Sequence, residues 1–260
     1  MKYFWSEWPT LQKKMRFNRP KLLLLDVDGT LAAIAKTPHS VVLSNKTKDA
    51  LRNLARLPHI QIVVISGRSI GDLRKLLSLN KIIYVGNHGL ELQGIKKRLP
   101  KEAVRARRCV RVMKHLARKL KADFYFWPGI LVEDKKFTLS VHYRLLPVGR
   151  WPAFNELIRF YIEKYKSYPV IWRKGKRVWE VCPKEGFDKG SATLYLAGLF
   201  SEAQVIAIGD DKTDEDMFRV MKRQGITIRV GYSRKSIAQY YFKSTEEVRE
   251  FLKKIPISEA

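Results

Sequence analysis

Leu22-Leu23-Leu24-Leu25-Asp26-Val27-Asp28-Gly29-Thr30 is the stretch that decides the fold of this 260-residue chain. An apolar run that ends in two carboxylates and a glycine predicts a buried parallel strand leading to an acidic sheet edge. Because side chains alternate along a strand, Asp26 and Asp28 project the same way at its carboxyl end, where open α/β sheets bind ligands. Their mutual repulsion would be relieved by a hard cation such as Mg²⁺. Alone, the string is also compatible with a polar turn.

A second stretch repeats this arrangement, because the apolar run 205–208 ends in Gly209 and a cluster of acids over 210–216. Between the two acidic stretches, the apolar run 62–65 is followed by Ser66, and Lys189 is expected near the start of a helix. The order along the chain is therefore carboxylate pair, hydroxyl, lysine and carboxylate cluster. The acids of 210–216 are also what the first turn of a helix favours, so a capping role stays open for them.

This ordered set resembles the haloacid dehalogenase superfamily of phosphatases. The resemblance implies that Asp26 is the nucleophile and Asp28 the general acid/base. It implies that the transferring phosphoryl group is held by Ser66, Gly67 and Lys189. It also implies Mg²⁺ as cofactor, with the metal shell supplied by Asp26, Asp28 (through its backbone carbonyl), Asp210, Asp211 and Asp214.

Each implied role has a chemical reason. Carboxylates form covalent intermediates in aspartyl-phosphate enzymes, and a departing alkoxide needs a nearby acid to protonate it. The charge on the phosphoryl oxygens is best met by fixed donors and a metal.

The resemblance implies an α/β fold, namely a HAD-like doubly wound parallel-sheet core with an inserted α+β cap domain (type C2). Local patterns agree: strands expected at 61–65, 81–85 and 205–208 alternate with helices at 45–57, 69–79 and 192–199, which predicts a parallel sheet. Between them the pattern changes to helix, two strands, helix, two strands. The expected division is core residues 1–100 with an N-terminal lead over 1–20, cap residues 101–183, and core residues 184–260.

The expected cap elements are a helix to about 121, strands at 130–133 and 137–144, a helix at 152–166, and strands at 168–173 and 178–182. The first helix carries a dense basic run with apolar Val104, Cys109, Val112, Leu116 and Leu120 on a stripe, which predicts docking on a sheet with cations outside. Closure of such a unit over a site would exclude water.

Longer strings narrow the resemblance to trehalose-6-phosphate phosphatases. They are Gly129-Ile130-Leu131-Val132-Glu133-Asp134-Lys135, Leu139-Ser140-Val141-His142-Tyr143-Arg144, Trp179-Glu180-Val181, Gly86-Asn87-His88-Gly89 and the stretch 209–216. The similarity runs from about residue 21 to 231. It implies a sugar phosphate as substrate and these substrate-binding candidates in the cap: Glu133, Lys135, His142, Arg144 and Glu180. Arg68, which follows the Ser66 loop, and His88, in a Gly-bounded turn, are two further candidates.

Alternatives stay open for these candidates. Glu133 and Lys135 could form a cross-strand ion pair that His142 or Arg144 braces. Arg68 could bind phosphate or a nearby acid, and His88 could orient the site or face the cap.

The charge balance is unusual, with 51 Lys+Arg against 25 Asp+Glu and a formal net charge of +26. Such a field attracts anions of any kind. The sequence shows no zinc-finger, aromatic RNA-binding or Arg/Gly-repeat pattern, so nucleic acid is not expected as a partner. A basic polyanion-binding protein on the same scaffold remains an alternative.

Location and redox state follow from composition. No apolar stretch is long enough to span a bilayer and no signal core opens the chain, so a cytoplasmic protein without membrane attachment is expected. Cys109 and Cys182 have no metal-like spacing and are expected to be reduced core thiols.

The leading hypothesis is a Mg²⁺-dependent phosphatase that hydrolyses trehalose 6-phosphate through an aspartyl-phosphate. A phosphatase of sucrose 6-phosphate or mannosyl-3-phosphoglycerate is the enzymatic alternative. Trehalose-6-phosphate synthase is the candidate protein partner, although no glycosyltransferase-sized segment is attached. A receiver-like signalling domain would have no use for a cap.

Overall fold

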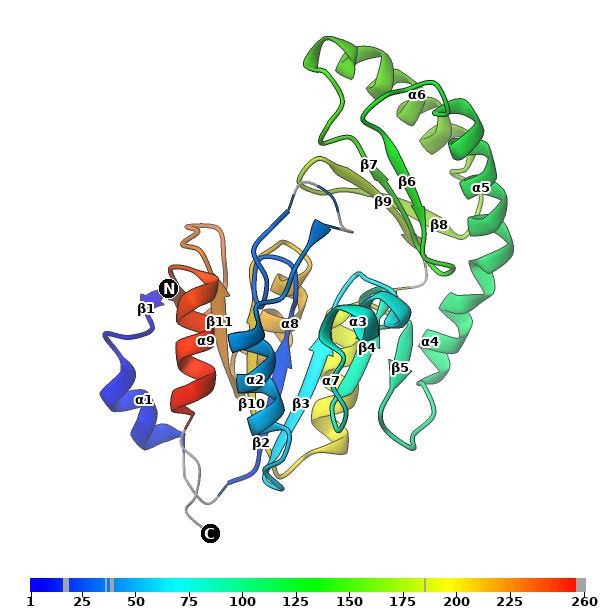
Figure 1. The fold of residues 1–260 in the computed structure, drawn as a ribbon. Coiled ribbons are helices and arrows are strands. Elements are labelled where there is room, and N and C mark those ends of the chain that lie inside the picture. Colours follow the sequence, from blue (N-terminus) through cyan, green and yellow to red (C-terminus); the bar gives the residue numbers. More distant parts are fainter. Residues whose placement is uncertain (16–18, 36, 38–39, 185, 256–260) are drawn as a thin grey trace. The chain divides into compact units, whose positions relative to one another are not determined.

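The computed structural model describes residues 1–15, 19–35, 37, 40–184 and 186–255. The chain forms two compact units. The colours of Figure 1 follow the sequence, so the residues of each unit can be located in it. The first unit, called the core unit below, comprises Met1–Arg98 and Asp188–Ala260, and the second, called the insert, comprises Leu99–Phe187. The sequence pattern placed the insert at 101–183, a few residues inside these bounds.

The core unit contains an eight-stranded sheet in the order β1-β12-β11-β10-β2-β3-β4-β5. Its strands are β1 (Lys2–Tyr3), β2 (Lys21–Leu25), β3 (Ile60–Ile65), β4 (Ile83–Gly86), β5 (Glu91–Gln93), β10 (Gln204–Gly209), β11 (Gly225–Val230) and β12 (Tyr240–Phe242). Neighbouring strands pair in parallel except β4 and β5, which are antiparallel. Strands β3, β4 and β5 therefore lie on one side of β2, and the strands that follow the insert, β10, β11 and β12, lie on its other side.

Helices cover both faces of this sheet. They are α1 (Trp8–Lys14), α2 (Asn45–Leu54), α3 (Ile70–Leu77), α7 (Lys189–Leu199), α8 (Asp214–Met221) and α9 (Thr245–Lys254). In Figure 1, α2 and α9 lie in front of the strands and α7 lies behind them. α8 packs on β10, and α7 packs on α8. This is the doubly wound arrangement predicted for the core.

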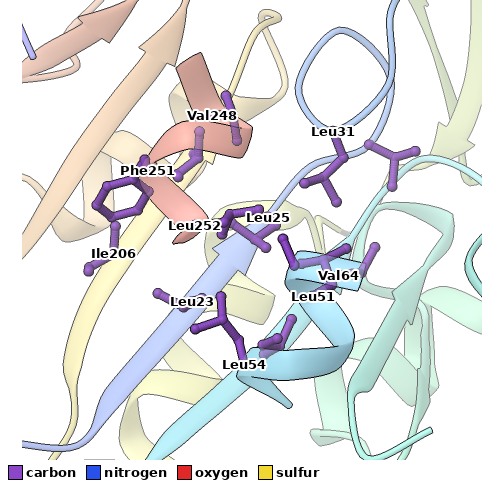
Figure 2. Close-up of a cluster of buried hydrophobic side chains, with 14 of the residues drawn as sticks. Leu23, Leu25, Leu31, Leu51, Leu54, Val64, Ile206, Val248, Phe251 and Leu252 are labelled. Atoms are coloured by element: carbon purple, nitrogen blue, oxygen red, sulfur yellow. The ribbon is translucent and has the colours of Figure 1, made fainter. Parts of the chain in front are cut away.

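The apolar run of β2 explains its central position. All five of its residues are buried, as expected for a parallel strand covered on both faces. Leu23 and Leu25 face the cluster drawn in Figure 2, where side chains from α2, α9 and the neighbouring strands meet. The labelled members of that cluster are Leu23, Leu25, Leu31, Leu51, Leu54, Val64, Ile206, Val248, Phe251 and Leu252. Leu22 and Leu24, which alternate with them, are also fully buried.

The outer strands of the sheet were not apparent in the sequence. β1 pairs with β12, and the N-terminal aromatic lead packs at that edge, where the ring of Phe4 lies 4.6 Å from Phe242 and 5.2 Å from Phe251, between centroids. β1 and β12 are only two and three residues long, too short to show a period of two. Their place depends on packing between distant segments.

The insert contains a four-stranded antiparallel sheet in the order β6-β7-β9-β8. Its elements are α4 (Lys101–Ala106), η3 (Arg107–Cys109), α5 (Val110–Asp123), β6 (Leu131–Asp134), β7 (Leu139–His142), η4 (Val148–Arg150), α6 (Trp151–Lys164), β8 (Val170–Lys174) and β9 (Val178–Pro183). One face of the sheet packs on α5 and α6 through Val141, Val181, Leu116 and Ile158. The insert is thus the α+β unit that the sequence pattern predicted.

The expected single basic helix to residue 121 is interrupted. A 3₁₀ turn at Arg107–Cys109 separates α4 from α5 and shifts the helical phase, since a 3₁₀ turn has three residues rather than 3.6. Leu116 and Leu120 are buried as expected, but Val104 is 51% exposed. The prediction that Val104 lies on the buried stripe was wrong, because Val104 lies about 140° around the helix from Cys109 even without the interruption.

Cys109 and Cys182 are free and buried. Burial raises the pKa of Cys109 to about 11 and that of Cys182 to about 12, so both stay as protonated thiols at neutral pH. Within the ranges described above, no helix combines the length and apolarity needed to cross a membrane.

Candidate active site

Strand register brings the acidic stretches together. Leu25 of β2 pairs with Ile208 of β10 on one side and with Val64 of β3 on the other. The residue after each strand end therefore meets its neighbours, and the Asp26 amide donates to the Ile208 carbonyl at 3.0 Å. This edge is where the sheet order reverses, the usual ligand position in such sheets.

Three carboxylates and one ammonium group meet at this edge. The Lys189 Nζ donates to Asp26 Oδ1 at 2.8 Å and to Asp214 Oδ1 at 2.7 Å. Lys189 begins α7, whose N-cap Asp188 accepts from the Ser191 amide at 2.9 Å. Lys189 and Asp26 are almost fully buried, and Asp214 is completely buried. The sequence-predicted residues Asp26, Asp214 and Lys189 are thus in direct contact.

Burial and crowding perturb these groups. Burial, followed by repulsion from Asp214, raises the pKa of Asp26 well above its ordinary value, although Lys189 opposes this. Burial likewise raises the pKa of Asp210 to about 7 and that of Asp214 to about 6. Burial would lower the pKa of Lys189, but Asp214 and Asp26 raise it well above its usual value. The lysine is therefore charged, and the acids outnumber it.

The donor set fits a hard divalent cation. Asp26, Asp210 and Asp214 each offer a carboxylate oxygen, and these oxygens lie within 4.8 Å of one another. Asp210 Oδ1 is buried without a hydrogen-bond partner among the described residues, a costly arrangement that a cation would correct. Gly29 keeps this space open, since it has a φ of +91° and a Cβ there would lie 2.2 Å from Asp210 Oδ2.

Asp211 lies differently from these three acids. Its Oδ1 accepts from the Thr213 amide and hydroxyl, both at 2.8 Å, and from the Asp214 amide at 3.2 Å. Those contacts tie the loop to the start of α8. The Asp211 carboxylate is not among the three that converge, so the structure brings together only part of the predicted metal set.

Asp28 contacts an arginine rather than the carboxylate cluster. Arg68 Nε donates to Asp28 Oδ2 and Arg68 Nη2 donates to Asp28 Oδ1, each at 2.6 Å. Of the two possibilities that the sequence left for Arg68, phosphate or a nearby acid, this structure shows the acid.

The loop after β3 carries the predicted phosphate-binding residues. The Ser66 Oγ accepts from the Arg68 amide at 3.2 Å, and the His88 amide donates to the Ser66 carbonyl at 3.0 Å. A Cβ on Gly67 would lie 2.5 Å from His88 Nε2, so a larger residue there would push the His88 ring aside. The loop that carries Ser66 and Gly67 therefore lies against the turn at Asn87–Gly89 that carries His88.

Two supports of this site were not predicted. Asn87 is fully buried with a φ of +50°, and its side-chain amide donates to Glu91 Oε2 at 2.9 Å. Glu215, which the sequence indicated only as a first-turn acid, accepts from Arg229 at 3.0 Å and from the Ile237 amide at 3.0 Å. The Gly-bounded string 86–89 was a usable signal for Asn87, because Asn tolerates this conformation. Nothing local marks the Glu215–Arg229 pair.

Most substrate candidates in the insert share one face of its sheet. Register pairs Glu133 with Ser140 and Ser140 with Glu180, opposite the face that packs on the helices. Lys135 Nζ donates to Ser140 Oγ at 2.8 Å and lies 3.5 Å from Glu133 Oε2, while His142 Nε2 lies 3.1 Å from the same oxygen. Arg144 lies beyond the end of β7 and donates to the Lys176 carbonyl at 3.3 Å. We call Glu133, Lys135, Ser140, His142 and Glu180 the polar face of the insert.

Comparisons with known proteins give consistent matches. A family model described as trehalose-phosphatase matches residues 24–247. The chain is 32% identical to trehalose 6-phosphate phosphatase RA3 of Zea mays, covering 90% of this chain and 69% of that protein. It is 33% identical to probable trehalose-phosphate phosphatase 3 of Oryza sativa subsp. japonica, with the same coverage.

Solved structures show the same fold at lower identity. The C-terminal domain of C. albicans trehalose-6-phosphate phosphatase matches with a TM-score of 0.79 at 24% identity, covering 95% of this chain and 96% of that chain. A haloacid dehalogenase-like hydrolase from B. subtilis matches with a TM-score of 0.55 at 17% identity, covering 90% and 99%. The predicted HAD-like fold is therefore confirmed.

Proposed function

This chain belongs to the trehalose-phosphatase family, and from that membership we propose that it hydrolyses trehalose 6-phosphate with Mg²⁺ through an aspartyl-phosphate. The chain is a phosphatase, and the resemblance to trehalose phosphatases expected from its motifs is confirmed. The proposal adds the substrate, the metal and the chemical steps.

The observation that carries the proposal is the buried cluster of Asp26, Asp214, Asp210 and Lys189 at the sheet edge. Among the described residues, the Lys189 ammonium group contacts two of the three carboxylates that converge there. Such a cluster is unfavourable unless a cation or protons offset its charge. Metal ligands and a fixed cationic donor stabilise the charge of a transferring phosphoryl group, and a carboxylate can act as the nucleophile that forms an aspartyl-phosphate.

In the first proposed step, an oxygen of Asp26 attacks phosphorus. A bond from that oxygen to phosphorus forms as the ester P–O bond breaks, and Asp28 gives its proton to the departing sugar oxygen. Lys189 is already placed against Asp26, where it fixes the carboxylate and meets phosphoryl charge.

In the second step, water attacks phosphorus and Asp28 takes the water's proton. The bond between Asp26 and phosphorus breaks, which restores the free carboxylate and releases inorganic phosphate. Ser66 and Gly67 are proposed to bind phosphoryl oxygens through the hydroxyl and the backbone, supported by their position in the turn beside His88.

The metal site is proposed to consist of Asp26, Asp210 and Asp214, with the Asp28 carbonyl as the further ligand. Asp211 is retained as a residue of the metal shell that acts through water. When bound, Mg²⁺ would neutralise negative charge on the phosphoryl group and on the carboxylates.

The polar face of the insert is proposed to recognise the sugar. Its carboxylates and cations are arranged to exchange hydrogen bonds with hydroxyl groups, which a protein discriminates through such paired polar contacts. Glu133, Lys135, Glu180 and His142 carry this role, with Arg144 and His88 as further substrate contacts. Their shared location on one sheet face supports it.

Two further proposals concern the setting. The substrate must come from an enzyme that joins two sugars, one of which carries a phosphate, so a trehalose-6-phosphate synthase is the proposed partner.

A cytoplasmic location is supported by the two buried free thiols, since reducing compartments keep cysteines unpaired.

A phosphate-release screen tests the proposal. Purified protein is given trehalose 6-phosphate, sucrose 6-phosphate, mannosyl-3-phosphoglycerate and glucose 6-phosphate, each with Mg²⁺ and with a chelator. The expected result is the highest kcat/KM on trehalose 6-phosphate and loss of turnover with the chelator. Equal or faster turnover of another sugar phosphate would replace the substrate, and metal-independent turnover would contradict the cofactor.

A further inference from the structure

The contact between Arg68 and Asp28 in the core unit is a two-point pairing that the proposed steps do not use. Two N–H groups of the guanidinium donate to the two different oxygens of one carboxylate, both at 2.6 Å. This fork is the geometry in which arginine fixes both the position and the plane of a carboxylate. The Arg68 side chain is 11% exposed and that of Asp28 is 37% exposed, so the pair lies at the rim of the site.

The backbone of Arg68 is held at both ends. Its amide donates to the Ser66 hydroxyl at 3.2 Å, and its carbonyl accepts from the Asn87 amide at 2.8 Å. Asn87 is in turn fixed by Glu91, whose carboxylate also accepts from the Ile70 amide at 2.9 Å. The guanidinium therefore projects from a loop that has little freedom to shift.

The backbone of Asp28 is also fixed. Asp28 and Ala32 form a parallel bridge, and the Gly29 amide donates to the Ala32 carbonyl at 2.7 Å. The turn needs the left-handed φ of Gly29, +91°. With both backbones held, the remaining freedom at Asp28 is its side-chain rotation, and the arginine fork restricts that rotation.

We propose that Arg68 is a positioning residue that holds the Asp28 carboxyl group in the orientation for proton exchange with the ester oxygen and with water. This inference rests on the proposed function, because it assigns Arg68 to the proton carrier of that reaction. Arg68 then acts through Asp28 rather than on the phosphoryl group.

The pairing is compatible with proton transfer. A carboxylate has about four lone-pair sites, and the fork uses one on each oxygen. The other sites can receive the proton of the attacking water, while in the protonated acid the O–H faces the ester oxygen. As the ester P–O bond breaks, the proton passes to the sugar oxygen and the carboxylate remains, still held by Arg68.

Leaving-group dependence separates this role from phosphate binding. A general acid matters for esters whose departing oxygen is strongly basic, such as a sugar alkoxide, and hardly for 4-nitrophenolate, which is stable without a proton. A residue that binds the phosphoryl group affects both esters equally, because the phosphoryl group is common to them. Phenyl phosphate and 4-nitrophenyl phosphate make a matched pair of nearly the same shape.

The experiment measures kcat and KM of wild type, Arg68→Ala, Arg68→Lys, Asp28→Asn and Arg68→Ala/Asp28→Asn on trehalose 6-phosphate, phenyl phosphate and 4-nitrophenyl phosphate. Arg74→Ala, which removes an exposed arginine of α3, is the matched control. Thermal unfolding of each variant checks that it is folded. Guanidinium chloride at low millimolar concentration is added to Arg68→Ala to supply the missing group.

We expect Arg68→Ala to lower kcat/KM on trehalose 6-phosphate by about 10²-fold, the size of a general-acid contribution, because kcat/KM reports only the steps up to departure of the sugar oxygen. On 4-nitrophenyl phosphate the loss of kcat/KM should be below about threefold by the same reasoning, with phenyl phosphate between them. The value of kcat also includes hydrolysis of the shared aspartyl-phosphate, which Asp28 assists for every ester. The double variant should be no slower than Asp28→Asn. Guanidinium should restore part of the loss, and Arg68→Lys should restore little because lysine cannot form the fork.

Equal losses of kcat/KM on the three esters, or additive losses of kcat/KM in the double variant, would overturn the inference and assign Arg68 to the phosphoryl group. A wild-type protein that releases phosphate from 4-nitrophenyl phosphate but not from trehalose 6-phosphate would overturn the proposed function and this inference with it. The two failures are therefore distinguishable.

Discussion

The core unit and the insert each contain a lysine set against carboxylates, but the two groups differ in burial and charge balance. In the core unit, Lys189 contacts two of three converging acids, and its side chain is 3% exposed. In the insert, Lys135 and His142 both lie near Glu133, whose side chain is 13% exposed. The core cluster has an excess of negative charge, whereas the polar face of the insert is closer to balanced.

This difference matches two kinds of chemistry. Excess buried negative charge favours a cation and supports reactions of a charged phosphoryl group. A balanced, partly exposed set can exchange hydrogen bonds with neutral hydroxyls at lower desolvation cost. We therefore expect substitutions in the core cluster to affect turnover and stability, and substitutions on the polar face to affect sugar affinity.

The largest expected effect is that of Asp26→Asn. Removing the nucleophile should lower kcat by at least ~10⁴-fold on every phosphate ester, because the covalent step is lost. Phosphate release is measured on trehalose 6-phosphate and 4-nitrophenyl phosphate, with Glu133→Gln as the matched carboxylate-to-amide control in the insert. Comparable losses in both variants would abolish the distinction between the two groups.

Next in size is the effect of Lys189→Met on stability. Removing the buried cation leaves Asp26 and Asp214 without their partner, so the free energy of unfolding should fall by about 3–5 kcal/mol. Lys135→Met should cost only about 1 kcal/mol because its neighbours keep other hydrogen bonds. Urea denaturation in the presence of a chelator measures both. Equal losses would show that burial does not separate the two sites.

Metal binding should depend on pH through the core acids. Because burial raises the pKa of Asp210 to about 7 and of Asp214 to about 6, the folded metal-free protein holds protons that the unfolded chain loses above about pH 4. Metal-free stability should therefore fall as pH rises from 4 through 7. Mg²⁺ competes with these protons and should stabilise more at pH 8 than at pH 5.5.

At 100-fold excess of free Mg²⁺ over its dissociation constant, the stabilisation at pH 8 should be about 2.7 kcal/mol. Differential scanning calorimetry at pH 5.5 and pH 8, with and without Mg²⁺, checks this. Asp210→Asn should abolish the Mg²⁺-dependent rise in Tm, while Glu180→Gln should keep it. A rise that is larger at pH 5.5 would contradict the arrangement of the metal site.

The smallest expected effect concerns the polar face. Glu133→Gln and Glu180→Gln should each raise KM for trehalose 6-phosphate about tenfold, because an amide oxygen accepts a weaker hydrogen bond from a sugar hydroxyl than a carboxylate does. KM for 4-nitrophenyl phosphate, which has no sugar, should be unchanged. If KM for both esters rises equally, these residues do not recognise the sugar.

The site residues that could be predicted from the sequence are those that lie in short local motifs. Asp26 follows a run of leucines that is apolar enough to mark a central strand, and Asp210 follows a similar run, so their meeting at one edge follows from parallel pairing. Lys189 could be placed at a helix start because Asp188 is a good N-cap. These features depend on local patterns and on a general rule of sheet topology.

What the sequence could not give depends on side-chain pairing between distant segments. Nothing local indicates that Arg68 contacts Asp28, since that contact depends on the turn that Asn87 and Glu91 hold. Asp211 and Asp214 are aspartates of the same acidic stretch, so the sequence does not distinguish them. The start of helix α8 decides which of the two carboxylates converges with Asp26 and Asp210. The 3₁₀ turn that interrupts the basic helix likewise has no clear sequence signal.

The proposed mechanism depends on a covalent bond between phosphorus and Asp26. Protein turning over ³²P-labelled trehalose 6-phosphate with Mg²⁺ is quenched in acid, digested and mapped by mass spectrometry. We expect the label on the peptide that contains Asp26, at a level that Asp28→Asn alters and Asp26→Asn eliminates. Label on a different residue, or full turnover without any labelled peptide, would contradict the account.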